Sequence, residues 1–413
     1  MKSKIKAFKN ILLMSIPEYI AGFSVFAILI FLAKKATLAE IGELTFANTT
    51  GQLIASILGV ALLTTMRRDF VLKTEIRDKY AVSLYITRGF ISLAIFVIAF
   101  LLFELNILSK IVLLMVASRG IDSLSETYYY TLLSKEKILK FSILKSLHYI
   151  SLIGSVVAGI YENLDLSQIS FIFLVNSIVW CAINFSLLFI EENIAKVFVF
   201  FDTYQNDLFK RTFPLLLSSS VYLLSTRLNI FIVKKVCSPE DFGLFSIIIS
   251  IMGIFSIFTS AISSFIINKQ IDWYKESLQR LKNNSIKLTI PFLGAGLCFL
   301  LVSYFAADYI NYLFKNFDMN HVWLLKISLI SIVIFFIQIP YNYLFTVIDK
   351  NKVALYFSLC MITVAALLYY PFTNYFGLQG AVIAFIAYNI LWCTILFGLS
   401  MYVINKQILK ENE

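Results

Sequence analysis

The sequence is poor in charged and reactive side chains. Only 15% of its 413 residues are Asp, Glu, Lys or Arg, against roughly 25% in soluble domains. It has two histidines and five widely spaced cysteines, so we predict no metal site and no disulfide framework. The motifs GxxxxGK[ST], HExxH and GxSxG are also missing. We therefore predict no ATP-hydrolysing site, no cofactor and no enzymatic activity.

Apolar residues dominate instead. They make up 59% of the chain, or about 244 residues, which excludes a water-soluble enzyme and a disordered chain. One membrane-spanning helix needs roughly 20 apolar residues, so this composition can supply up to about twelve spans. The composition predicts a polytopic membrane protein with almost no room for a soluble domain.

Apolar runs of spanning length can be followed along the chain. The first, Ile11–Ala33, is too long for a typical signal peptide and is followed by no small-residue cleavage site, so we interpret it as a retained helix. The second run is diluted by polar residues, which indicates that it faces protein or a watery cavity more than lipid. The predicted spans are 11–33, 44–66, 80–103, 111–133, 141–161, 169–190, 212–233, 243–267, 286–307, 322–346, 353–372 and 378–404.

The basic residues sort by loop. With twelve spans, 24 of the 35 Lys and Arg fall at the two termini and in the even-numbered connections, and only six fall in the odd-numbered ones. Basic residues concentrate on the cytoplasmic side of membrane proteins, so both termini are predicted to be cytoplasmic. The net charge of +10 therefore reports topology, and we predict no nucleic-acid partner.

The two halves of the chain are related. The stretch that begins with Lys34-Lys35 and contains Gly42 recurs about 200 residues later, beginning with Lys234-Lys235 and containing Gly243. Each copy follows the first span of a half. The fold class predicted is therefore all-α and polytopic, with twelve transmembrane helices in two pseudo-symmetric six-helix bundles. The halves are 1–191 and 212–413, joined by a cytoplasmic linker, 192–211. Transporters are commonly built from such like-oriented repeats.

Three short segments resemble a known family. They are Phe213-Pro-Leu-Leu-Leu-Ser218, Glu240-Asp-Phe-Gly-Leu-Phe245 and Tyr375-Phe-Gly-Leu-Gln-Gly-Ala381. Together with the length and duplication, they resemble the polysaccharide transporters of the multidrug/oligosaccharidyl-lipid/polysaccharide exporter superfamily, and most closely the O-antigen flippases (Wzx-type). In physical terms, small residues such as Gly380 permit close helix approach. The seventh span departs from this resemblance, because relatives often carry an acidic residue where this chain has Arg227 and Asn229.

The resemblance implies a function and partners. A family member would move an undecaprenyl-pyrophosphate-linked oligosaccharide, an O-antigen or polysaccharide repeat unit, from the inner to the outer leaflet of the bacterial inner membrane by alternating access. It would contact membrane lipids and work beside a polysaccharide polymerase and a chain-length regulator.

Ionisable residues within spans are costly and are functional candidates by default. Glu18 could couple transport to protons, or could be a neutral carboxyl bonded to a neighbouring helix. Arg119, Asp122 and Glu126 are spaced i, i+3 and i+7, which places them on one helical face. Arg119 and Asp122 can pair, either as a lock within the bundle or as part of a substrate and ion-coupling network.

Arginine keeps its charge and binds phosphate through two donors. A cavity lined by Arg88, Arg119 and Arg227 is therefore the predicted substrate site for a pyrophosphate head group. For Arg88 the interpretation we favour is nevertheless that it extends its guanidinium to the cytoplasmic interface. For His148 we favour the interpretation as a hydrogen-bonded interior residue over that as a proton relay.

Three functions remain open from the sequence. The first is the lipid-linked oligosaccharide flippase. The second is a drug/cation:ion antiporter of the same superfamily, which would favour acidic residues in its cavity. The third is a membrane glycosyltransferase or polymerase, which would need longer external loops than this chain has.

Overall fold

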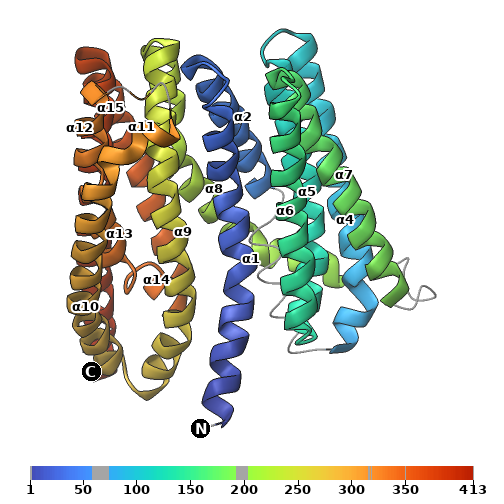
Figure 1. Ribbon diagram of the computed structural model, residues 1–413. Helices are drawn as coiled ribbons and strands as arrows, with labels where there is room; N and C mark the ends of the chain where they lie inside the picture. The colour runs from blue at the N-terminus through green and yellow to red at the C-terminus, as the bar shows by residue number, and fades with distance from the viewer. Residues whose placement is uncertain are drawn as a thin grey trace. The chain divides into compact units, whose positions relative to one another are not determined.

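The computed structural model describes residues 2–57, 74–191, 203–314, 317, 319–348 and 350–412 (Figure 1). This described part of the chain contains helices and no strand. The helices are α1 (Lys2–Leu32), α2 (Leu38–Ile57), α4 (Thr74–Glu104), α5 (Lys110–Ser134), α6 (Ile138–Tyr161), α7 (Leu166–Glu191), α8 (Thr203–Val236), α9 (Pro239–Glu276), α10 (Leu278–Ala306), η2 (Ala307–Tyr309), α11 (Ile310–Leu313), α12 (Met319–Ser328), α13 (Ile330–Gln338), α14 (Leu344–Val347) and α15 (Asn351–Asn412).

The helices match the predicted spans. In the described ranges, nine helical stretches are long and apolar enough to cross a membrane. The last of them contains two predicted spans, because two helices meet within α15 at Gly377, whose φ is +56°. The second and fourth predicted spans correspond to α2 and α5, which are not among these nine stretches, and residues 58–66 of the second lie outside the described residues. The prediction of an all-α polytopic membrane protein is confirmed.

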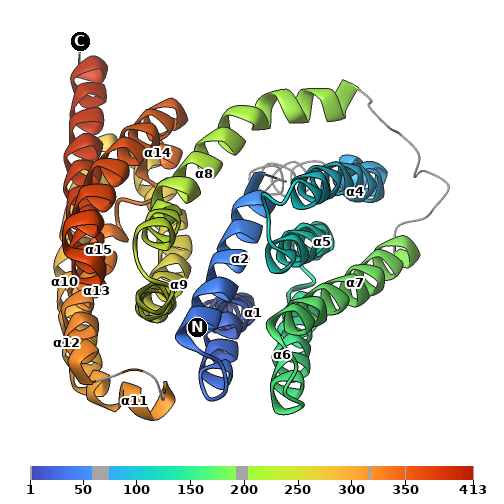
Figure 2. The ribbon, with the colours of Figure 1, turned by 90° about the horizontal axis from the view of Figure 1, so that it is seen from above.

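By its internal contacts the chain divides into two compact units. Unit 1 is Met1–Leu32 with Glu43–Leu224, and unit 2 is Ala33–Gly42 with Ser225–Glu413. In unit 1, α5 packs against α7 and α4, and α1 packs against α6; in unit 2, α13 packs against α10, α15 and α9 (Figure 2). The proposed halves and the linker 192–211 remain a prediction, since residues 192–202 lie outside the described part and α8 begins at Thr203.

The duplicated stretch begins a helix in the same way in both copies. The Thr37 hydroxyl accepts the backbone N–H of Glu40 at 3.3 Å, and the Ser238 hydroxyl accepts that of Asp241 at 3.1 Å. Such caps satisfy donors that the first turn of a helix leaves unpaired. The two capped positions are 201 residues apart in sequence, which agrees with the 200-residue repeat and its one inserted residue.

Within unit 2 the two copies also touch each other. A Cβ added to Gly243 would lie 2.0 Å from the carbonyl oxygen of Leu38, and one added to Gly42 would lie 2.7 Å from the Phe242 ring. Only glycine allows backbones to approach this closely. The repeated glycines therefore serve helix packing at the starts of α2 and α9.

One predicted span is interrupted. The range 322–346 is divided into α12, α13 and α14, with turns between Gln338 and Leu344. Pro340 has no N–H to continue a helix. Its carbonyl oxygen accepts the Nε2 of the buried Gln270 side chain at 2.6 Å, which satisfies backbone polarity that an apolar surrounding would otherwise leave unpaired.

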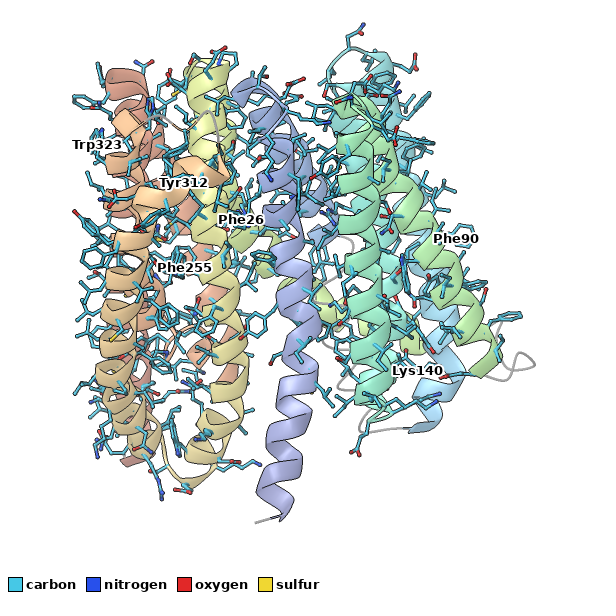
Figure 3. All side chains as sticks on the ribbon, viewed as in Figure 1. Phe26, Phe90, Lys140, Phe255, Tyr312 and Trp323 are labelled. Atoms are coloured by element: carbon cyan, nitrogen blue, oxygen red, sulfur yellow. The ribbon has the colours of Figure 1, made fainter. Side chains whose placement is uncertain are left out.

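Apolar side chains are exposed on the outer faces of the helices as well as buried between them. On α4, Phe90, Leu93 and Leu101 are exposed, and Figure 3 shows Phe90 projecting from the ribbon. In unit 2, α10 has the same character, with Ile290 and Val302 exposed. Lipid tails are as apolar as these side chains, so these faces suit a hydrocarbon surrounding. Polar side chains of the same helices make contacts in the interior of each unit.

The close contact at Gly380 gives a stability prediction. Its Cβ would lie 1.9 Å from the Phe372 carbonyl oxygen, so Gly380→Ala must push the two helices of α15 apart. We expect a loss of about 1–3 kcal/mol, the usual cost of overpacking, seen as a lower thermal midpoint of the purified protein. The control is Gly398→Ala in the same element, where nothing lies within 4 Å. Equal midpoints for the two variants would contradict the close approach.

Candidate functional site

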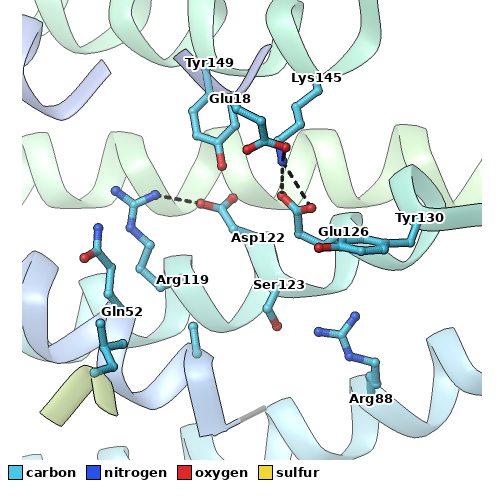
Figure 4. A pocket seen from close by; sticks show the side chains of 12 residues that line it. Glu18, Gln52, Arg88, Arg119, Asp122, Ser123, Glu126, Tyr130, Lys145 and Tyr149 are labelled. Carbon is cyan, nitrogen blue, oxygen red and sulfur yellow. Dashed lines mark hydrogen bonds and ion pairs between the residues drawn. The ribbon is translucent and has the colours of Figure 1, made fainter. Parts of the chain in front are cut away.

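Unit 1 contains a charged cavity of about 410 Å³ (Figure 4). Five helices of this unit, α1, α2, α4, α5 and α6, supply eleven of its twelve lining residues. Among these are three cationic and three acidic side chains, so the formal charges balance. The lining residues are Glu18, Gln52, Ala55, Arg88, Arg119, Asp122, Ser123, Glu126, Tyr130, Lys145, Tyr149 and Leu223.

Helix α5 provides the centre of the cavity wall. Arg119, Asp122 and Glu126 all line the cavity, as their helical spacing predicts. The Arg119 Nη1 atom lies 3.0 Å from Oδ2 of Asp122, and both side chains are largely buried. The expected ion pair is therefore present. It offsets part of the cost of removing two charges from water.

A second helix completes the coordination of Arg119. Its Nε and Nη2 atoms donate to the Oδ1 of Asn48 on α2, at 2.9 and 2.7 Å. Gly51 makes this reach possible, because a Cβ there would lie 2.8 Å from the Met115 carbonyl oxygen of α5. The polar residues of α2 thus face protein and the cavity, as expected from the sequence, and the Arg119 guanidinium is held on three of its nitrogens.

Lys145 on α6 is the residue that sequence reasoning missed. Its ammonium nitrogen lies 2.9 Å from a carboxylate oxygen of Glu18 and 2.9 Å from one of Glu126. The lysine side chain is 5% exposed, whereas those of Glu18 and Glu126 are 52% and 24% exposed. A buried cation thus joins α1, α5 and α6 (Figure 4). The available signal was a lone lysine within an otherwise apolar span, which needs a counter-charge.

Arg88 on α4 is buried, with 1% of its surface exposed. The favoured interpretation that it extends to the interface is therefore wrong. Its Nη1 atom donates to the Thr127 hydroxyl, its Nε atom has no hydrogen-bond partner, and no described carboxylate lies within ion-pair distance. Packing of α4 against α5 encloses the side chain, and it lines the cavity without a counter-ion of its own.

Arg227 belongs to the other unit. It lies on the portion of α8 that belongs to unit 2, is half-buried, and is not among the residues that line this cavity. Of the predicted site residues, the structure thus brings together Arg88, Arg119, Glu18, Asp122 and Glu126.

Behind the cavity wall lies a second polar layer around His148 on α6. Its Nε2 atom is 3.4 Å from Oδ1 of Asp122, and its Nδ1 atom is 3.4 Å from the Tyr129 hydroxyl. That hydroxyl accepts the Nδ2 of Asn184 on α7 at 3.2 Å. His148 is buried and stacks on the Trp180 ring, with centroids 5.4 Å apart. Asp122 therefore has the Arg119 guanidinium on one side and an imidazole on the other.

Within the described ranges, no group of three or more His, Cys, Asp or Glu side chains is arranged to hold a metal ion.

Comparisons with known proteins place the fold. No protein-family model matches the chain, and no curated protein matches its sequence. Among solved structures, an outward-facing multidrug resistance MATE family transporter of the MOP superfamily matches with a TM-score of 0.64 and 17% identity, over 98% of this chain and 97% of that chain. An inward-facing one gives 0.65 and 14% over 96% and 98%. A MOP superfamily transporter from Pyrococcus furiosus, described by the reverse polarity of its binding pocket, gives 0.63 and 15% over 96% of each chain. The chain thus shares the fold of these transporters over nearly its whole length.

The shared lysine gives a testable coupling. Lys145→Met should destabilise the protein, because it leaves two carboxylates facing each other without a cation. The loss should be below the roughly 3–5 kcal/mol of a fully buried pair, since both carboxylates partly reach the cavity. Adding Glu126→Gln to Lys145→Met should recover part of the thermal midpoint. The conservative control is Lys145→Arg, which keeps the charge. If the double variant is no more stable than Lys145→Met alone, the three-residue cluster is not an electrostatic unit.

Proposed function

We propose that this protein is a membrane transporter that moves a lipid-linked oligosaccharide, with an anionic pyrophosphate head group, from the inner to the outer leaflet of the bacterial inner membrane. Transport would proceed by alternating access of a charged cavity. The observation that supports it most directly is Arg88: a buried guanidinium that lines the cavity and has no carboxylate partner among the described residues.

The distribution of charge within the cavity favours an anion at this position. Lys145 between two carboxylates forms a cluster of formal charge −1, and the Arg119–Asp122 pair is neutral. Arg88 supplies the remaining +1. A buried charge without a partner is costly, so a phosphate oxygen bound there would both satisfy the free Nε donor and offset the charge.

The fold supports the transport step. Its likeness to both inward-facing and outward-facing transporters supports a transport cycle in which this helical arrangement takes up both states. The chain has no ATP-hydrolysis motif, so an ion gradient or the substrate gradient would supply the energy. The membrane potential offers about 2.3 kcal/mol per charge per 100 mV, which is enough to bias such an equilibrium.

A drug/cation antiporter is the second candidate, and two observations favour it. The solved neighbours include multidrug resistance transporters. In addition, the Glu18 carboxylate is half exposed at a cluster of net negative charge, which could attract a cation. The pocket of reversed polarity described for one neighbour supports the view that this fold can hold pockets of either sign, so the sign of the substrate must be measured.

The polymerase and chain-length regulator expected from the sequence would act on the exported units. They belong to this proposal as partners, together with the surrounding lipids.

Arg88→Gln tests the sign of the substrate. In proteoliposomes that contain a polyprenyl-pyrophosphate oligosaccharide, we expect this variant to slow transfer between leaflets at least tenfold, because the head group loses a charge-assisted contact worth about 1.5–3 kcal/mol. The control is Lys137→Gln, which removes a cation whose side chain is 45% exposed and lies outside the cavity.

The competing function makes the opposite prediction in the same vesicles. A cation antiporter would export a cationic dye, and Arg88→Gln would leave that export unchanged or raise it. Undiminished lipid transfer by Arg88→Gln would contradict the anion proposal, and dye export by the unmodified protein would favour the antiporter.

A further inference from the structure

We propose that His148 is a positioning residue that controls whether Arg119 is available to an anionic substrate, through competition for the shared carboxylate of Asp122. This inference rests on the proposed anion transport and adds to it a means of regulating the cavity. It assigns a role to a residue that does not line the cavity itself.

The carboxylate of Asp122 lies between the Arg119 guanidinium and the His148 imidazole. Oδ2 of Asp122 holds Nη1 of Arg119 at 3.0 Å, while Oδ1 faces Nε2 of His148 at 3.4 Å. Within the described part of the chain, neither Oδ1 nor Nε2 has a hydrogen-bond partner, although both atoms are buried. An unsatisfied buried donor or acceptor carries a free-energy cost. The pair is thus close enough to bond after a small shift, and a shift toward His148 would draw the same carboxylate away from Arg119.

Protonation of the imidazole would tip this balance. The ring nitrogen that is unprotonated in neutral His148 takes up one proton from the aqueous phase, so that both nitrogens carry hydrogen and Nε2 can donate to Oδ1 of Asp122. The resulting imidazolium attracts Oδ1 of Asp122 with a charge-assisted hydrogen bond. Asp122 then neutralises His148 in place of Arg119. The cavity, formally balanced with neutral His148, gains one positive charge, located on Arg119.

The surroundings of His148 leave Asp122 as its nearest counter-charge. From α5 it faces Asp122 and the Tyr129 hydroxyl. From its own helix it stacks on Tyr149, and from α7 on Trp180. The other two carboxylates of the cavity, Glu18 on α1 and Glu126 on α5, are both paired with Lys145.

Substrate binding and protonation are then linked. An anion that binds the released Arg119 stabilises the state in which Asp122 serves His148, and protonation of His148 tightens anion binding by the same factor. Couplings of this kind are on the order of 5- to 150-fold. The arrangement gives the cavity a charge state that follows proton availability, with Asp122 as the element that has two arrangements.

The optical part of the experiment needs no substrate. The emission of Trp180 is obtained as the difference between the full-length protein and its Trp180→Phe variant, in lipid nanodiscs, between about pH 5 and pH 8, the range in which imidazoles ionise. A stacked imidazolium quenches indole emission, so Trp180 emission should fall as the pH falls. His148→Gln should abolish this change, and the matched replacement of the other histidine, His321→Gln, should preserve it.

The binding part uses inorganic sulfate, which remains a dianion over this range and so does not itself titrate. Its affinity for the unmodified protein should be at least about fivefold tighter at the acidic end. His148→Gln should bind weakly at both ends, because Arg119 stays with Asp122. Asp122→Asn should bind tightly at both ends, because Arg119 is released regardless of pH.

The outcomes separate the two proposals. Trp180 emission that does not depend on His148, or sulfate affinity with the same pH dependence in His148→Gln, would overturn this inference and leave anion transport standing. Absence of sulfate binding at every pH, in the unmodified protein and in Asp122→Asn, would overturn the proposed function and this inference together.

Discussion

The free-energy cost of placing charge in a hydrocarbon surrounding is the constraint on which the first unit depends. Lys145 is almost fully buried and is stabilised by carboxylates from two other helices, Glu18 on α1 and Glu126 on α5. Arg119 likewise joins α5 to α2 through Asn48. The same contacts therefore hold the bundle together and build the cavity wall. Changing one partner alters both the stability of unit 1 and the chemistry of its cavity, because neither ion can be left alone.

Among the described residues, every charged side chain of the cavity except Arg88 has an ion-pair partner, and that exception carries the functional argument. Arg119 pairs with Asp122, and Glu18 and Glu126 share Lys145 with one negative charge left over. Within the described residues, Arg88 bonds the Thr127 hydroxyl and forms no ion pair. A balanced cavity costs least when empty, yet a transporter must also discriminate between ligands. A guanidinium without an ion-pair partner, beside charged groups that have partners, limits the cost of the empty cavity and provides one strong contact for an anion. The half-exposed Glu18 is the opposing feature, and it is the reason that a cationic substrate is also considered.

The second unit has buried polar groups of a different kind. Its buried polar side chains in the described ranges are hydroxyls and amides, among them Asn229, Gln270 and Gln338, without a buried Lys, Arg, Asp or Glu. Where its helix is interrupted at Pro340, an amide from α9 caps the free carbonyl. The duplicated stretches still begin α2 and α9 with equivalent caps. These caps agree with the predicted duplication, while the buried charged side chains of the described residues all belong to unit 1.

The sequence by itself determined the fold class and most of the cavity's charged residues. Apolar run length is a property of local sequence, and it sufficed for the spans; helical periodicity sufficed to place Arg119, Asp122 and Glu126 on one face. Two outcomes needed the tertiary structure. The burial of Arg88 depends on how α4 packs against α5, and the role of Lys145 depends on two carboxylates that stand 127 and 19 residues away in the chain. A local pattern gives the cost of a buried charge, but only the packed helices decide which partner offsets it.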